Sequence, residues 1–199
     1  MRLASPLLLV LLLPFWGGCF VFLDHQLDAS DAAEFVATQE DFAGFLSWAH
    51  VDVGNAAAEA PHEAPVRTAY LNAPPDEGAV VFPVGTIIVK TGAGGEGSGA
   101  AGSDVHAMVK RGGAFNDDGA RGWEWFEIRI PNGDADPVLV WRGANPPDGE
   151  SYGCPAGEVC DDEGLTCNAC HEAAAGNDFV NSTALRLDHI DASLLGAGL

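Results

Sequence analysis

The stretch WEWFEIRI at residues 123–130 decides the fold of this chain. In a β-strand successive side chains point to opposite faces, so residues two apart share a face. One set of alternate positions carries Phe126, Ile128 and Ile130, and the other carries two tryptophans followed by a glutamate and an arginine. This alternation, with its aromatic and β-branched side chains, predicts a β-strand.

Four further segments of the same character lie on either side, at residues 66–71, 80–91, 105–111 and 138–142. Turn residues separate the strands, for example Pro74-Pro75, the stretch NDDG at 116–119, PNG at 131–133 and NPP at 145–147. Strands this close together, without helices of ten residues between them, indicate an antiparallel sheet.

A helix is expected before the strands. The stretch TQED at residues 38–41 fits a capping box, and apolar residues recur with helical period at 42, 45, 46, 48 and 49. We expect His50, at the end of this helix, to be a helix-terminal cation rather than a ligand. The fold class that follows is mainly β: an antiparallel sheet with short N-terminal and C-terminal helices.

The first 19 residues have the features of a secretion signal. Arg2 precedes an apolar run at residues 7–15, and Gly17 and Gly18 precede Cys19. A cysteine after small residues resembles the lipobox of bacterial lipoproteins, although Trp16 stands where leucine is usual. We expect a lipid anchor at Cys19, an acidic tether over residues 20–37 and one domain over 38–199. Ordinary signal-peptidase cleavage is the alternative route to the periplasm.

The charge of the chain restricts its partners. The 199 residues include 29 acidic and 9 basic side chains, which gives a formal net charge of −20. Such a charge argues against binding to nucleic acid or to an anionic membrane surface. It fits a cationic redox partner, and a merely solvated surface explains it equally well. The membrane is expected to be reached only through the lipid anchor, because the apolar run is short for a membrane span.

Residues Cys167-Asn168-Ala169-Cys170-His171 form the pattern C-x-x-C-H, the attachment signature of a c-type haem. Two thiols one helical turn apart can form thioethers with the two vinyl groups of one porphyrin, and the adjacent histidine can ligate its iron. A redox dithiol and a Cys₄ zinc site are the other interpretations. The zinc site would add Cys154 and Cys160, whose separation is wider than in usual zinc pairs. If the haem and lipid assignments hold, Cys154 and Cys160 are left to form a disulfide.

The other side of the iron has no evident ligand. No methionine follows His171, and Met108 lies in an expected strand, where we interpret it as a core residue. None of the remaining histidines has a context that singles it out as a ligand: His25, His50, His62, His106 and His189. An iron with an open position favours binding or conversion of a small molecule over pure electron transfer.

These elements, in this order, resemble cytochrome P-460 and its relative cytochrome c′-beta, β-sheet haem proteins with the attachment motif near the C-terminus. The resemblance runs from about residue 42 to 180 through Trp48, Pro61-His62, VRTAYLN at 66–72, FPVGTIIVK at 82–90, AMVKR at 107–111, GWEW at 122–125, the C-x-x-C-H motif and NDFV at 177–180.

The resemblance implies a mono-haem c-type cytochrome that oxidises hydroxylamine, with nitric oxide as a second candidate substrate. A binding protein for nitric oxide without turnover, as in cytochrome c′-beta, is the alternative. A lipoprotein with purely structural cysteines is the non-haem alternative. The expected partners are a small nitrogen-containing ligand or substrate and a cationic redox partner, with a homodimer left open.

The resemblance also implies roles for particular residues. In cytochrome P-460 a lysine is covalently joined to the porphyrin edge, and the match F-P-x-G-T-x-x-V-K assigns that role to Lys90, with Lys110 as the second candidate. Catalytic members of the family carry a proton-relaying carboxylate about one turn after the haem histidine. Here Glu172 follows His171 directly and three alanines come next, so the candidate relay Glu172 departs from the family pattern.

Overall fold

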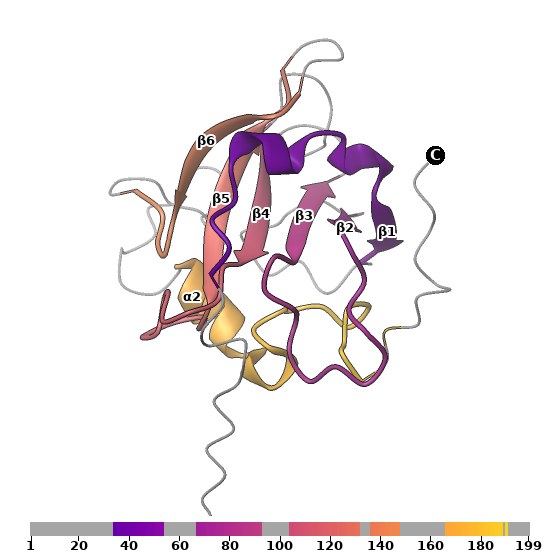
Figure 1. The fold of residues 1–199 in the computed structure, drawn as a ribbon, viewed down its shortest axis with the longest axis vertical. Helices are drawn as coiled ribbons and strands as arrows, with labels where there is room; N and C mark the ends of the chain where they lie inside the picture. Colours follow the sequence, from indigo (N-terminus) through magenta and orange to yellow (C-terminus); the bar gives the residue numbers. More distant parts are fainter. Residues whose placement is uncertain are drawn as a thin grey trace, which may run out of the picture.

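The computed structural model describes residues 34–53, 67–92, 104–131, 136–147, 166–188 and 190. Within them, six antiparallel strands form one sheet in the order β1-β2-β3-β4-β5-β6, so that neighbours in sequence are neighbours in the sheet (Figure 1). The strands are β1 (Ala49–Asp52), β2 (Arg67–Leu71), β3 (Ile87–Gly92), β4 (Asp104–Lys110), β5 (Trp123–Arg129) and β6 (Val138–Gly143). The prediction of a mainly β, antiparallel fold is confirmed.

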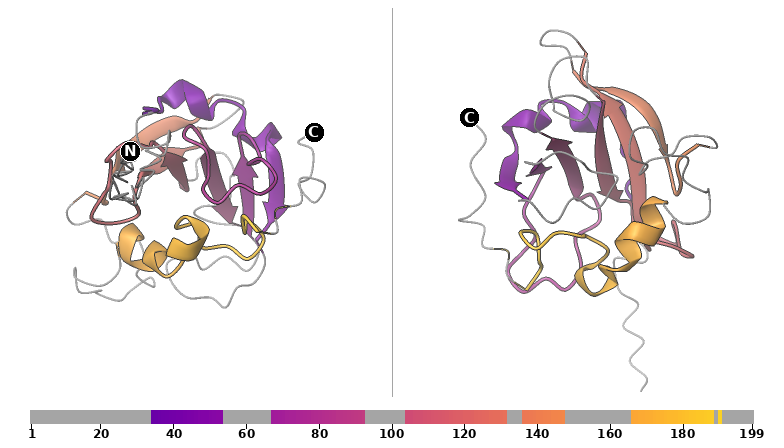
Figure 2. Two further views of the ribbon diagram at one scale, coloured as in Figure 1. Left: turned by 60° about the horizontal axis from the view of Figure 1, so that its bottom comes forward. Right: turned by 180° about the vertical axis from the view of Figure 1, so that it is seen from behind.

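Short helices stand at the two ends of this region. Two 3₁₀ helices, η1 (Gln39–Phe42) and η2 (Phe45–Ser47), precede the sheet, and α2 (Cys167–Glu172) and η3 (Ala175–Asn177) follow it. The view on the left of Figure 2 shows η1 and η2 on the opposite side of the sheet from α2. The described residues contain no helix with the length and apolar character needed to cross a bilayer.

Strand β5 shows why the sheet has two covered faces. Its side chains alternate as predicted, with Phe126 and Ile128 in one buried cluster and Trp123 and Trp125 in another. Trp125 lies opposite Met108 of β4, and Phe126 lies opposite Ala107. Both faces of the central strands therefore bury apolar surface, and each needs its own covering layer.

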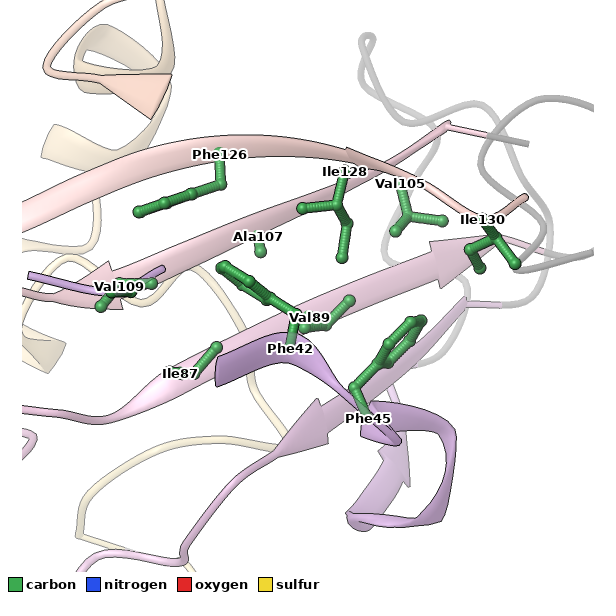
Figure 3. Close-up of a cluster of buried hydrophobic side chains, with 11 residues drawn as sticks. Phe42, Phe45, Ile87, Val89, Val105, Ala107, Val109, Phe126, Ile128 and Ile130 are labelled. Carbon is green, nitrogen blue, oxygen red and sulfur yellow. The ribbon is translucent and has the colours of Figure 1, made fainter. Parts of the chain in front are cut away.

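The N-terminal 3₁₀ helices supply the cover for the first face. The ring of Phe42 lies 5.2 Å from that of Phe126, and Phe45 packs edge-on against Tyr70. Figure 3 shows Phe42 and Phe45 pointing into a cluster with Phe126 and with aliphatic residues of β3, β4 and β5. Ala37 is also fully buried in this cluster, so the packed domain includes the last residues of the expected tether.

The predicted amphipathic helix is wrong beyond its first turn. Asp41 does accept hydrogen bonds from the Thr38 N–H and hydroxyl, at 2.7 and 2.9 Å, as a capping interaction requires. Gly44, however, adopts a left-handed conformation with φ 66°, and this interrupts the helix. His50 consequently lies in strand β1, paired with Tyr70 of β2, and is not a helix-terminal cation.

The second predicted strand is shorter than expected. It begins at Ile87, not at residue 80, because Pro83 and Gly85 (φ 93°) form a turn just before it. Asn72 braces this turn: its amide donates to the Gly85 carbonyl and accepts from the Ile87 N–H. The other four predicted strands agree with the structure to within about a residue at each end.

Several predictions fall outside the described residues. These are the signal segment with Cys19, most of the tether, the Cys154–Cys160 disulfide, and three of the candidate histidines, His25, His62 and His189.

Candidate functional site

Helix α2 carries the C-x-x-C-H motif on the second face of the sheet. Thr166 caps it, because its hydroxyl oxygen accepts from the Ala169 N–H at 3.2 Å. Residues three apart in a helix share a side of it, so Cys167 and Cys170 lie one above the other. Both cysteines and His171 line a cavity of about 630 Å³ between α2 and the sheet. This volume lies within the range of small-molecule and cofactor sites.

The sheet and the C-terminal segment form the rest of the cavity wall. The strands contribute an apolar and aromatic surface with a few polar groups, and the segment after η3 closes the opposite side. The side chains from the strands include Arg67, Ala69, Ile88, Lys90, His106, Met108, Trp125 and Trp141, and those from the segment include Val180, Ser182, Thr183 and Leu185.

Lys90, the residue that the sequence analysis expects to bond to the porphyrin, lies on this wall. It lies in β3 between Ala69 of β2 and His106 of β4. Burial, and to a lesser degree the neighbouring Arg67, lower the pKa of Lys90 from its ordinary value of 10.5 to about 7, although the nearby cysteines oppose the shift. A large fraction of its amine is therefore uncharged near neutral pH and able to act as a nucleophile.

Lys110, the second candidate, is committed elsewhere. Its Nζ donates to Asp178 Oδ1 at 2.6 Å and to the Arg121 carbonyl at 3.2 Å, and it lies over the ring of Trp123. Lys110 is buried and does not line the cavity. Of the two lysines, Lys90 alone is on the same cavity as the motif.

His171 is held in one orientation and one protonation state. Its Nδ1 lies 2.6 Å from the Phe179 carbonyl oxygen, which can only accept, so Nδ1 carries the proton and Nε2 keeps its lone pair. Burial lowers the pKa of His171 from 6.5 to about 4, so the ring is neutral at physiological pH. A neutral imidazole with one ring N–H on a backbone carbonyl is the usual arrangement of a metal-binding histidine.

Arg67 adds a second cation to the wall. Its Nε is buried and has no hydrogen-bond partner among the residues that the structure describes. Those described residues place no aspartate or glutamate on the cavity wall, although the chain as a whole is strongly acidic. The cavity therefore suits an occupant that is largely apolar and carries anionic groups.

These residues fit a covalently attached haem, which has an apolar ring, two vinyl groups and two carboxylates. They fit a redox dithiol less well, since burial raises the pKa of Cys167 to about 11, whereas reactive dithiols need a lowered pKa. The zinc alternative depends on Cys154 and Cys160, which lie outside the described residues. Within the described part, no three or more His, Cys, Asp and Glu side chains form a metal-binding group.

The remaining predicted residues divide between wall and surface. Met108 is buried in the cavity wall, opposite Ile88 and Trp125, in keeping with a core role. Glu172 is exposed at the end of α2 and does not line the cavity. His106 lines the cavity, whereas His50 does not.

Asn168, an unspecified position of the motif, is a site residue that the sequence analysis missed. Its Oδ1 accepts from Asn116 Nδ2 at 2.8 Å, from the Ala120 N–H at 3.1 Å and from Trp125 Nε1 at 3.0 Å. Its Nδ2 donates to Asn116 Oδ1 and to the Ala144 carbonyl. This amide fastens α2 to the sheet and to two loops, and no sequence signal marks it.

The candidate site thus combines two cysteines one helical turn apart, a neutral histidine and a lysine with a lowered pKa on one cavity. No family model, curated protein or solved structure matches this chain.

Proposed function

We propose that this chain is a periplasmic, mono-haem c-type cytochrome that oxidises hydroxylamine at an iron with an open coordination position, in the manner of cytochrome P-460. One observation carries the proposal: Cys167, Cys170, His171 and Lys90 line a single cavity. The two cysteines and the histidine have the order that haem attachment requires, and the lysine stands where the resemblance expects a bond to the porphyrin.

Each residue then has a defined task. Cys167 and Cys170 hold the group through thioethers, and Nε2 of His171 is the iron ligand. The haem supplies a redox-active iron that can accept electrons from a bound nitrogen compound. Met108 belongs to the apolar wall and would not hold the iron.

Lys90 forms a third covalent link in this proposal. Its amine is uncharged in a large fraction of molecules near neutral pH, as a nucleophile must be. Bond formation removes one hydrogen from the amine and one from a porphyrin carbon, which amounts to two electrons and two protons. A peroxide, reduced to water, is a sufficient oxidant for this step. Such a link would give the protein one more means of altering the reactivity of the iron.

Oxidation of hydroxylamine releases one proton for each electron removed. The electrons pass to a redox partner, for which a cationic protein suits a chain of net charge −20. The protons need an acceptor, and among the described wall residues outside the motif His106 is the one able to take up a proton once Lys90 is bonded. Its cavity position makes it a better relay candidate than the exposed Glu172.

A second function is favoured by the lack of a carboxylate on the described cavity wall. Without an efficient proton acceptor, the open iron would bind nitric oxide and not turn over, as in cytochrome c′-beta. This alternative keeps the haem and both thioethers and drops the Lys90 bond.

Turnover of hydroxylamine with an artificial electron acceptor, measured on the fully matured protein, separates the two functions. We expect turnover in the wild type, a large loss in His106→Gln, and little change in Glu172→Gln. Proteolysis and mass spectrometry should recover Lys90 and the 167–171 peptide joined through one haem. A free Lys90 peptide, together with nitric oxide binding but no turnover, would instead establish the binding function.

A further inference from the structure

We propose that the buried Lys110–Asp178 ion pair positions the imidazole of His171 and thereby tunes it as an iron ligand, from a place outside the cavity. The link between them is the turn at Asp178 and Phe179, whose carbonyl accepts the hydrogen bond from His171 Nδ1. The effect on iron rests on the proposed function, whereas the effect on the imidazole does not.

The turn is strained and therefore needs support. Asp178 and Phe179 both adopt left-handed conformations, with φ values of 50° and 64°. Neither residue is glycine, and such conformations persist only where the surrounding structure imposes them. Two in succession make the direction of the Phe179 carbonyl depend on the contacts that hold the turn.

Those contacts converge on Asp178. Its Oδ1 accepts from Lys110 Nζ at 2.6 Å, and its Oδ2 accepts from the Phe82 N–H at 2.8 Å. Its backbone carbonyl accepts from Trp123 Nε1 at 2.7 Å. The ion-paired side chains are only 8% and 6% exposed, so the pair is shielded from water and screened little by salt.

The next peptide unit is fixed from its other side. The Val180 N–H, which shares a plane with the Phe179 carbonyl, donates to the Asn177 carbonyl at 3.0 Å. The Phe179 carbonyl, which accepts from His171, is thus held between the contacts of Asp178 and this hydrogen bond. A buried ion pair adds little net stability over apolar side chains of the same volume, so a positioning role gives it a clearer purpose.

The expected consequence is a change in the donor strength of His171. A short bond from Nδ1–H to a fixed carbonyl raises the basicity of the other ring nitrogen. Loosening the turn weakens that bond and favours the ferrous over the ferric iron. Loss of such outer partners typically costs about 10- to 100-fold in metal affinity, and here the loss is expected to fall mainly on the ferric state, which depends most on a strong donor. A tenfold change in the ferric-to-ferrous preference corresponds to about 59 mV for one electron.

Two variants separate positioning from simple electrostatics. Lys110→Met removes a positive charge and Asp178→Ala removes a negative one, so a purely electrostatic effect would shift the midpoint potential in opposite directions. Positioning predicts that both variants raise the potential, by about 59 mV or more. The matched control is Glu124→Gln, since Glu124 is equally buried, pairs bidentately with Arg142 at 2.6 Å, and lies on the opposite face of the sheet. The midpoint potential of this control variant should stay at the wild-type value.

A second measurement, made on the chain without haem attachment, tests the positioning of the imidazole independently of the iron. Nitrogen-15 NMR at neutral pH should show His171 with its proton on Nδ1, and Lys110→Met should increase the other tautomer. A wild-type ring protonated on Nε2, or potential shifts of opposite sign in the two variants, would overturn the inference. A chain that takes up no haem but shows the Nδ1 tautomer would refute only the proposed function.

Discussion

Asn168→Ala tests how the motif helix is fastened to the sheet. The substitution removes an acceptor from two buried donors, the N–H of the fully buried Ala120 and Nε1 of Trp125. A buried donor left without a partner costs about 1–3 kcal/mol, so the two together lower the free energy of unfolding by about 2–6 kcal/mol. That is a large part of the roughly 5–15 kcal/mol by which a domain is stable. Urea unfolding of the full chain, followed by far-UV circular dichroism, measures the loss.

Gly119→Ala should reproduce the defect by an independent route. A Cβ on Gly119 would overlap the side-chain amides of Asn168 and Asn116, so Asn168 would have to move. Glu172→Gln is the control, because Glu172 is exposed on the same helix and should change stability by no more than about 0.5 kcal/mol. A loss below about 1 kcal/mol in Asn168→Ala would refute the claim that this amide anchors the helix.

Three further predictions concern the ligands of the iron, the buried titratable groups and the lipid anchor. Met108→Leu keeps an apolar wall and should leave the spin state of the iron unchanged in the visible spectrum; conversion from six to five coordination would show that Met108 is a ligand. Lowered pKa values mean that the unfolded haem-free chain binds more protons, so stability should rise with pH from about 4 to 6.5 through His171 and from about 7 through Lys90. The Lys90 rise should be clearest below pH 9, because above it the raised pKa of Cys167 makes stability fall with pH. The rise in stability above pH 7 should vanish in Lys90→Met. If it persists in that variant, it belongs to another group. Cys19→Ala should move the protein from the membrane to the soluble fraction without changing its haem content, and wild-type protein found wholly soluble would exclude the lipid anchor.

The sheet could be predicted because its signal is local. Alternation along residues 123–130 and turn residues between the strands specify β5 and its neighbours without any tertiary information. Strand β1 could not be found in this way, since its four residues follow apolar positions with helical spacing. What ended the helix was the left-handed Gly44, and what made the strand was its pairing with β2.

The candidate site also contains residues that the sequence could predict and residues that it could not. The spacing C-x-x-C-H and the match around Lys90 predicted residues that the structure brings to one cavity. Asn168 and the Lys110–Asp178 pair were beyond prediction, because their partners lie 11 to 68 residues away in the sequence and only the folded sheet brings them together. Lys110 in particular shares a strand with the cavity residues His106 and Met108, and only its contact with Asp178 shows that it serves another purpose.

The pyridine haemochrome spectrum of the full chain, matured with haem-attachment machinery, tests the central claim most directly. The proposal predicts a thioether-linked haem at one per chain, retained after denaturation and lost in the Cys167→Ser/Cys170→Ser double variant. Protein that folds under the same conditions but carries no covalently bound haem would contradict it.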